Sequence, residues 1–253
     1  MKQSKVEELL IINGKKQFRR PRERVHFTRI NEADDLLNNI EEYPHGFVFG
    51  CIMDRQVKAE IAWSIPYKIY KKRLGDFTFK SFSELSRGEI KELMIKPQPL
   101  HRFPKIMADF FYNAIQIITH DYNGDTSKIW SGDLSSAEVV YRFLQFQGVG
   151  PKIATMAANI LVRDFKIKLK DYYSIDISPD VHIKRVFKRL KLIHDEATIE
   201  ELVYKARSIH PEYPGILDYS TWEIGRNWCK PNKPLCSECY LSEFCPSSNI
   251  KNS

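Results

Sequence analysis

The chain has 253 residues, of which 43% are hydrophobic, and its Gly and Pro contents are ordinary. This combination is typical of a globular protein with a substantial core, folded as one large domain or two joined lobes. The longest apolar run, Phe47 to Met53, is too short to span a membrane, and the first ten residues lack a signal-peptide pattern. We therefore expect a soluble, intracellular protein of the cytoplasm or nucleoid, with no membrane partner. The formal net charge of +7 favours a polyanionic partner such as nucleic acid, with a solvated basic surface as the alternative.

The predicted elements are helical throughout the chain. A basic cluster between Lys15 and Arg24 indicates either a polyanion contact or a flexible tail. Residues 31–42 and 104–119 carry apolar side chains at helical spacing, and residues 196–207 repeat the pattern more weakly. The run from Phe47 to Met53 is apolar throughout, so its local pattern fits a strand or a helix. Because no strand-turn-helix units are visible, we predict an all-α fold.

A helical hairpin is predicted over residues 134–161. Ser135 and Glu138 form the pattern of a capping box at the start of its first helix. Gly148-Val149-Gly150 breaks the pattern, and Pro151 suits the first position of a second helix. The buried stripes are predicted to be Val140, Phe143 and Leu144 in the first helix and Ile153, Ala157, Ile160 and Leu161 in the second.

The glycines of this hairpin predict a phosphate contact. They leave backbone N–H groups free and let an anion approach the positive end of the second helix. In a basic protein, this arrangement indicates contact with the DNA backbone that does not depend on base sequence. A tight turn between two helices, with no ligand, is the alternative.

Lys152 lies in the first turn of the second helix. Most lysines are simply exposed to solvent. A neutral lysine amine is also a nucleophile, which forms a Schiff base with the aldehyde carbon of a sugar. Further along, Asp180 follows Ser178-Pro179 at the start of another helix, where a carboxylate commonly caps the helix.

The helix that begins near Asp180 has a basic face. Its predicted buried stripe is Ile183, Val186, Phe187 and Leu190, and its cations are Lys184, Arg185, Lys188, Arg189 and Lys191. A solvated basic face and a contact with phosphates fit this pattern equally well.

Four cysteines lie in the last 25 residues with the spacing C-x6-C-x2-C-x5-C, namely Cys229, Cys236, Cys239 and Cys245. Such a group is a metal site or a disulfide knot, and the lack of a signal peptide favours the metal. A zinc ribbon usually has two close cysteine pairs, whereas this loop has one. A four-cysteine iron–sulfur cluster therefore fits better than zinc. Cys51, inside the apolar run, is expected to be a buried thiol.

Together these features resemble the endonuclease III family of helix-hairpin-helix DNA glycosylases. Residues 144–154, LQFQGVGPKIA, are similar to the family's hairpin L-x-x-L-P-G-V-G-x-K-T-A, and the cysteine spacing matches the family's cluster loop. SPDVHIKRVFKRL (178–190) resembles V-D-T-H-x-x-R-V-x-x-R-L, and PHGFVFGCIMDRQ (44–56) resembles a family helix that ends in a glutamine. Gln147 and Pro151 depart from the usual residues of the hairpin.

The resemblance implies a two-lobed helix-hairpin-helix DNA glycosylase fold with a C-terminal iron–sulfur loop. Residues 44–162 are expected to form a helical barrel domain that ends in the hairpin, and residues 1–43 and 163–253 a cluster domain. The implied cofactor is a [4Fe-4S] cluster held by the four cysteines. The cluster is expected to be a scaffold that presents Lys230 and Lys233 to phosphates, and Phe47 to Met53 is expected to be helical.

The resemblance also implies a base-excision-repair DNA glycosylase with associated AP lyase activity. Lys152 falls on the family's catalytic lysine and Asp180 on its catalytic aspartate. Gln56 falls on the glutamine that fills the gap left by an everted base, with Arg55 or Met53 as alternative wedges. The other residues expected to contact DNA are Gly148, Val149, Gly150 and His182.

The implied substrate is double-stranded DNA with a damaged base or an abasic site. A monomer is the default oligomeric state, because the sequence gives no obvious reason for oligomerisation. An oxidised pyrimidine is the default lesion, although residues 58–100 carry no family signature that would specify the base. A monofunctional glycosylase for another lesion and a non-catalytic helix-hairpin-helix DNA-binding protein are the alternatives.

Overall fold

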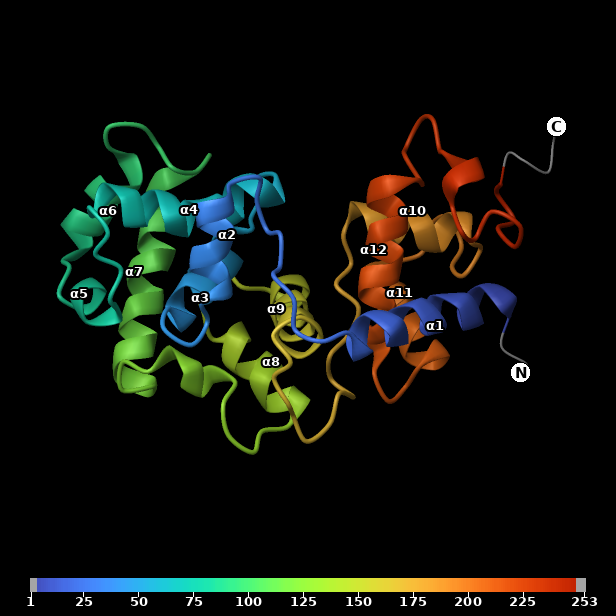
Figure 1. The fold of residues 1–253 in the computed structure, drawn as a ribbon, viewed down its shortest axis with the longest axis horizontal. Coiled ribbons are helices and arrows are strands. Elements are labelled where there is room, and N and C mark those ends of the chain that lie inside the picture. Colours follow the sequence, from blue (N-terminus) through green and yellow to red (C-terminus); the bar gives the residue numbers. More distant parts are fainter. Residues whose placement is uncertain (1–3, 249–253) are drawn as a thin grey trace. The chain divides into compact units, whose positions relative to one another are not determined.

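The computed structural model describes residues 4–248, and every regular element in that range is a helix (Figure 1). The predicted all-α class is therefore confirmed. The chain folds into two compact units. Unit 1 takes the described residues up to Arg22, residues 133–140 and the described residues from Ala154 onward, and unit 2 takes Glu23–Gly132 and Tyr141–Ile153. Within residues 4–248, no helix combines the length and the apolar character that crossing a membrane requires.

Unit 2 is built around a helix that has no polar face. Its helices are α2 (Asn31–Asn38), α3 (Pro44–Met53), α4 (Ala59–Lys72), α5 (Phe79–Ser83), α6 (Arg87–Ile95), α7 (Pro104–Asp121) and the short 3-10 helix η1 (Thr126–Ile129). Helix α3 packs against α2, α4 and α7, and its side chains from Phe47 to Met53 are fully buried. Because α3 is covered on all sides, its sequence shows no helical periodicity. The structure confirms the helix that the resemblance implied.

Close packing holds α3 in place. A Cβ atom added to Gly50 would lie 2.5 Å from a ring carbon of Trp63, so α4 approaches α3 more closely than any larger residue would allow. Near the start of α3, His45 places Nε2 2.8 Å from the carbonyl oxygen of Phe77. Aromatic rings, including Phe77 and Phe49, surround the imidazole. Burial lowers the pKa of His45 to about 4, so the ring is neutral in the folded protein.

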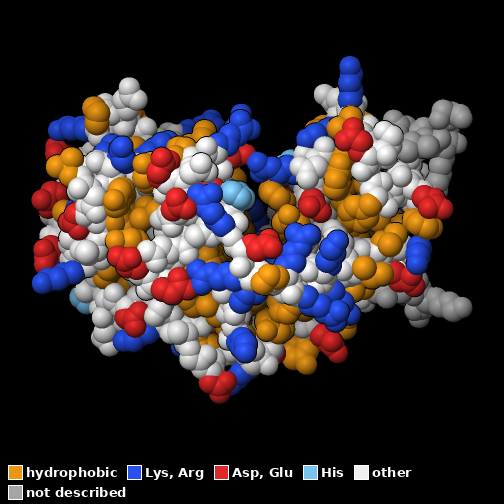
Figure 2. Space-filling view, viewed as in Figure 1, with side chains coloured by type: hydrophobic (Ala, Val, Ile, Leu, Met, Phe, Trp, Pro, Cys, Tyr) orange, Lys and Arg blue, Asp and Glu red, His pale blue; other side chains and the backbone are white. Residues whose placement is uncertain are grey.

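The basic N-terminal cluster is ordered, so its interpretation as a flexible tail is wrong. Its first half, from Lys15 to Arg19, lies in α1 (Lys5–Arg19), which begins with a capping box formed by Ser4 and Glu7. The viewed face of the protein carries Lys and Arg side chains with Asp and Glu among them (Figure 2). The basic cluster ends at Arg24, whose guanidinium pairs with Asp35 at 2.9 Å.

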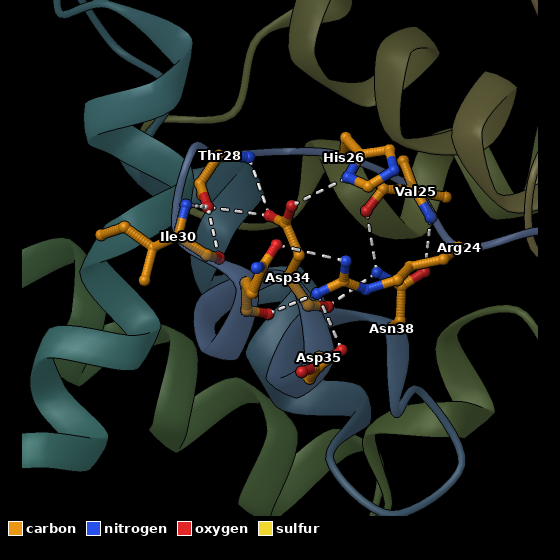
Figure 3. A network of polar contacts seen from close by, with 9 residues as sticks. Arg24, Val25, His26, Thr28, Ile30, Asp34, Asp35 and Asn38 are labelled. Carbon is orange, nitrogen blue, oxygen red and sulfur yellow. Dashed lines mark hydrogen bonds and ion pairs between the residues drawn. The ribbon is translucent and has the colours of Figure 1, made fainter.

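The segment between α1 and α2 is fixed by polar contacts with α2 (Figure 3). Asp34 is almost fully buried, and its Oδ1 accepts hydrogen bonds from both the N–H and the hydroxyl of Thr28, each 2.8 Å long. Asn38 exchanges two hydrogen bonds with the backbone of Val25. Together with the stacking of Phe27 on Trp63, these contacts hold a segment that has no regular secondary structure.

Unit 1 surrounds α12. Its elements are α1, most of α9 (Pro151–Arg163), α10 (Val181–Arg189), α11 (Ile199–Ile209), η2 (Pro214–Leu217), α12 (Asp218–Asn227) and η3 (Cys236–Glu238), together with the first residues of α8 (Ser136–Leu144). Helix α12 packs against α1 and α10. The contact with α10 requires a glycine, because a Cβ atom at Gly225 would lie 2.7 Å from the Cβ atom of His182.

Candidate active site

The predicted helical hairpin is present. Ser135 Oγ accepts the N–H of Glu138 at 3.2 Å in front of α8, and Pro151 is the first residue of α9. Gly148 has a φ of +91°, and a Cβ atom there would lie 2.5 Å from the ring of Phe110. Both the backbone conformation and the packing therefore require glycine at this position. By contrast, a Cβ atom at Gly150 would have no neighbour within 4 Å.

The turn of the hairpin uses one of the N–H groups that we expected to be free. The N–H of Val149 donates to the carbonyl of Phe146 at 3.0 Å, and the Val149 side chain is buried. The expectation of a free N–H is therefore wrong at Val149. The predicted buried stripe of α9 is correct. In α8, Phe143 is buried as predicted, but Val139 is buried in place of Val140 and Leu144.

The segment after α3 forms an irregular turn next to the hairpin. Helix α3 ends at Met53, so Gln56 is not the end of the helix as the sequence suggested. Gln56 is exposed and adopts a φ of +54°, a conformation that costs free energy in a residue other than glycine. Met53 is fully buried, which removes it as an alternative wedge.

Arg55 connects this turn to the hairpin. Its guanidinium donates to the carbonyl of Gly148 at 3.2 Å and lies over the ring of Phe110, 5.6 Å from the ring centre. Arg55 is nevertheless on the surface. The structure thus assigns the side chain a structural contact within unit 2, whereas its contact with DNA stays a prediction.

Lys152 pairs with a carboxylate that the sequence reasoning missed. Its Nζ lies 3.1 Å from Oδ2 of Asp54, the residue that follows α3. The Lys152 side chain is 40% exposed, whereas that of Asp54 is only 9% exposed. The sequence carried one signal for this pair: Asp54 directly follows the apolar run from Phe47 to Met53, and a nearly buried carboxylate needs a partner. Cys51 is the buried thiol that we expected; burial, followed by the charge of Asp54, raises its pKa well above the usual value.

Asp180 caps α10 in unit 1. Its Oδ1 accepts the N–H groups of His182 and Ile183, each at 2.8 Å. The loop before it is held by Asp218, whose Oδ1 accepts the N–H of Ser178 at 2.6 Å. Burial raises the pKa of Asp218 to about 6. Because Lys152 belongs to unit 2 and Asp180 to unit 1, their joint action stays a prediction.

His182 has a packing role in unit 1. It is half-buried beside Gly225 of α12, and its Nδ1 lies 3.1 Å from Nη2 of Arg185. These contacts give His182 a structural role within unit 1. A contact of His182 with the DNA backbone stays a prediction.

The four C-terminal cysteines line one cavity of about 40 Å³. Residues of α10, α12 and the loop form its other walls. Burial raises the pKa of the Cys239 thiol, and the other three cysteines add to the shift, which reflects their proximity. Among residues 4–248, no three His, Cys, Asp or Glu side chains are grouped as ligands of a single metal ion. A four-iron cluster attaches each thiolate to a different iron and so needs a wider spacing than a single ion. A cluster at this cavity stays a prediction.

Two arginines of the basic helix hold the cysteine loop. Arg185 donates to the carbonyl of Cys229 at 2.7 Å. Arg189 donates to Sγ of Cys229 at 3.3 Å and to the carbonyls of Lys230 and Pro231. Both arginines therefore contact the protein itself, a role that neither a solvated basic face nor a phosphate contact anticipated.

The lysines of the cysteine loop lie on its surface. Lys230 and Lys233 are both exposed, and the Lys230 ammonium donates to the carbonyl of Arg226. Exposure leaves either side chain accessible to a polyanion.

Comparison with known proteins points to one group of enzymes. No protein-family model matches the chain. Endonuclease III of Thermotoga maritima is 23% identical over 211 residues, which is 82% of this chain and 85% of the relative. The chloroplastic endonuclease III homolog 2 of Arabidopsis thaliana is 22% identical, with 79% of this chain and 47% of the relative covered.

Solved structures show the same fold. An endonuclease III–DNA covalent intermediate has a TM-score of 0.59 and 16% identity, and it covers 87% of this chain and 95% of its own. A thermostable thymine-DNA glycosylase has a TM-score of 0.61 and 14% identity, with coverages of 96% and 97%. These matches confirm the predicted resemblance to the endonuclease III family and the helix-hairpin-helix DNA glycosylase fold.

Proposed function

We propose that this relative of endonuclease III is a base-excision-repair DNA glycosylase with an associated AP lyase activity. The observation that carries the proposal is Lys152, a partly exposed amine in the first turn after a Gly-x-Gly hairpin, next to the carboxylate of Asp54. A related endonuclease III has been captured as a covalent intermediate with DNA, which supports chemistry of this kind. An oxidised pyrimidine in double-stranded DNA is the first substrate to test.

The proposed reaction begins with eversion of the damaged nucleotide, because a base inside the duplex is out of reach. Gln56 occupies the gap, a role that suits an exposed side chain held in a strained turn. Lys152 attacks C1′ and displaces the base, and the imine that forms permits β-elimination, which nicks the strand. Asp180 stabilises the positive charge that develops at C1′ while it caps α10.

The DNA backbone is bound by the hairpin and by basic side chains. The space around Gly150 admits a phosphate to the positive end of α9. Lys230 and Lys233 add charge from the cysteine loop, with Arg55 beside the hairpin and His182 near the start of α10. Val149 contributes its buried side chain to the hairpin rather than a free N–H group.

The cofactor that we propose is a [4Fe-4S] cluster on Cys229, Cys236, Cys239 and Cys245. When bound, it supplies a rigid, thiolate-ligated core for the loop. Arg189 offsets the negative charge of the Cys229 thiolate through its contact with the sulfur. The chain's own contribution is to hold this loop, with its two lysines, against α10 and α12.

Borohydride trapping tests the lyase. Wild-type protein incubated with abasic-site DNA and sodium borohydride should give a covalent protein–DNA adduct, detected by denaturing electrophoresis. Lys152→Arg should abolish the adduct and keep the fold, because a guanidinium still pairs with Asp54 but is not a nucleophile.

Two results would contradict the lyase. If the wild type gives no adduct, a monofunctional glycosylase or a DNA-binding protein without catalysis replaces it. If Lys152→Arg still forms the adduct, another amine is the nucleophile. Release of base from oligonucleotides with defined lesions then distinguishes an enzyme from a binding protein.

A further inference from the structure

We propose that Asp54 is the proton acceptor for the Lys152 amine. This inference rests on the proposed function, and it assigns to unit 2 a carboxylate that acts directly on the nucleophile. The Oδ2 atom of Asp54 lies 3.1 Å from Nζ of Lys152, which is hydrogen-bonding distance. Asp180, in contrast, has its Oδ1 engaged with two backbone N–H groups of α10.

The position of Asp54 is fixed from the core outward. It follows α3, whose side chains from Phe47 to Met53 are fully buried, and its N–H donates to the carbonyl of Cys51 at 3.1 Å. The carboxylate is therefore attached directly to the buried core of unit 2. Its side chain is only 9% exposed, so water gives it little stabilisation and its pairing with the Lys152 cation matters more.

The turn that carries Asp54 makes a second contact with the hairpin. Arg55 donates to the carbonyl of Gly148, while Asp54 meets Lys152 at the start of α9. Two adjacent residues of the turn thus contact both sides of the Gly-x-Gly bend. This double contact fixes the carboxylate relative to the amine, as a proton transfer requires. The buried His101 lies against the backbone of Met53 and Arg55.

The chemistry balances without another reactant. An ammonium has no electron pair, so Lys152 first transfers one proton to Asp54. The freed pair on Nζ then forms a bond to C1′ of the ring-opened abasic sugar, and the aldehyde oxygen becomes a hydroxyl as a second proton moves from nitrogen to oxygen. Asp54 returns its proton to this hydroxyl, which leaves as water. The product is the protonated imine between Nζ and C1′, to which borohydride delivers a hydride.

The test measures the rate of adduct formation under single-turnover conditions. Asp54→Asn keeps the shape and the polar contact of the side chain but cannot accept the proton. We expect it to slow trapping by about 100-fold or more, the usual contribution of a positioned acid or base. Asp54→Glu should recover part of the rate. Asp54→Ala should be slow, and added formate should raise its rate by replacing the missing carboxylate.

Matched controls separate this role from a structural one. Asp109→Asn removes a carboxylate of unit 2 that pairs with Arg87, and it should trap at the wild-type rate. Binding of DNA with a tetrahydrofuran abasic analogue, which cannot form an imine, should be unchanged in Asp54→Asn. Thermal unfolding should show that each variant is folded.

Three results decide the matter. A slow Asp54→Asn with normal binding, together with rescue of Asp54→Ala by formate, supports the proposal. An Asp54→Asn variant that traps as fast as the wild type, or faster, overturns it, because the ion pair is then only an obstacle to attack. Absence of any adduct with the wild type is a failure of the proposed lyase itself, and the wild-type lane reveals that failure separately.

Discussion

The two glycines of the hairpin are constrained by different partners. Gly148 is required by the protein, because its φ is +91° and Phe110 occupies the space of a Cβ atom. Gly150 has open space where a side chain would be. If the hairpin binds DNA, the need for glycine at this second position comes from the phosphate that approaches it.

Alanine substitutions at the two glycines should therefore have different effects. Gly148→Ala should destabilise the fold by about 1–3 kcal/mol, through backbone strain and overpacking. Gly150→Ala should cost less stability but weaken DNA binding, because a methyl group keeps the phosphate from close approach. Urea unfolding and DNA affinity at constant salt measure the two effects. A Gly150→Ala variant that binds DNA as tightly as the wild type would contradict the phosphate contact at the hairpin.

Sequence patterns identified residues whose role depends on residues close to them in the sequence. Lys152 stands out because it follows Gly148-Val149-Gly150-Pro151, and the local pattern alone defines the hairpin. Asp54 lies 98 residues before Lys152, and no periodicity indicates which distant side chains meet. A local pattern also gave no reason to expect that the N–H of Val149 would be used within the turn.

Among the helices, the sequence predicted which segments are helical better than it predicted where each helix begins and ends. The resemblance extended α3 to Gln56, whereas the helix ends at Met53, because the turn bends to bring Asp54 and Arg55 to the hairpin. In α7, the buried face starts at Met107, while Ile106 is exposed. Phe110 belongs to the apolar pattern of residues 104–119, yet it is only half-buried, and its ring lies against Gly148 and Arg55.

Helix α3 should make the protein sensitive to acid. The pKa of His45 is about 4 in the folded protein, against an ordinary value of 6.5, because burial disfavours the charged ring. The unfolded chain therefore binds the proton first. The stability that depends on the neutral His45 ring is fully present above pH 6.5 and is lost as the pH falls towards about 4. The free energy of unfolding should fall by up to about 3 kcal/mol over this range.

A pH series of urea unfolding measures this effect. His45→Gln does not titrate, so its free energy of unfolding should be lower at neutral pH but fall less steeply on acidification. His120→Gln, at an exposed position of α7, should keep the wild-type slope. Comparison with the wild type cancels the opposite contribution of Asp218, whose raised pKa of about 6 makes its burial less costly in acid. Equal slopes for His45→Gln and the wild type would show that His45 does not cause the acid sensitivity.

At the scale of the whole molecule, each unit joins segments that are far apart in the sequence. Unit 1 combines α1 with residues 133–140 and with the described residues from Ala154 onward. Composition and periodicity describe single segments, so they do not reveal which segments share a core. The cysteine loop shows the same limit: its spacing predicts a metal site, but only the structure shows that Arg185 and Arg189 of α10 hold the loop.

Unit 1 should depend on the proposed iron–sulfur cluster for its stability. Protein purified under anaerobic conditions should contain iron and acid-labile sulfide in equal amounts, because four thiolates around one cavity suit a [4Fe-4S] cluster. Cys236→Ser should lower the iron content and accelerate hydrogen exchange in α10 and α12, which line the cavity. Exchange in α3 and α7 of unit 2 should be unchanged. Cys51→Ala, which removes the cysteine that lies outside the loop, should keep the full iron content. One zinc ion per chain without sulfide would contradict the cluster, and so would iron that persists in Cys236→Ser.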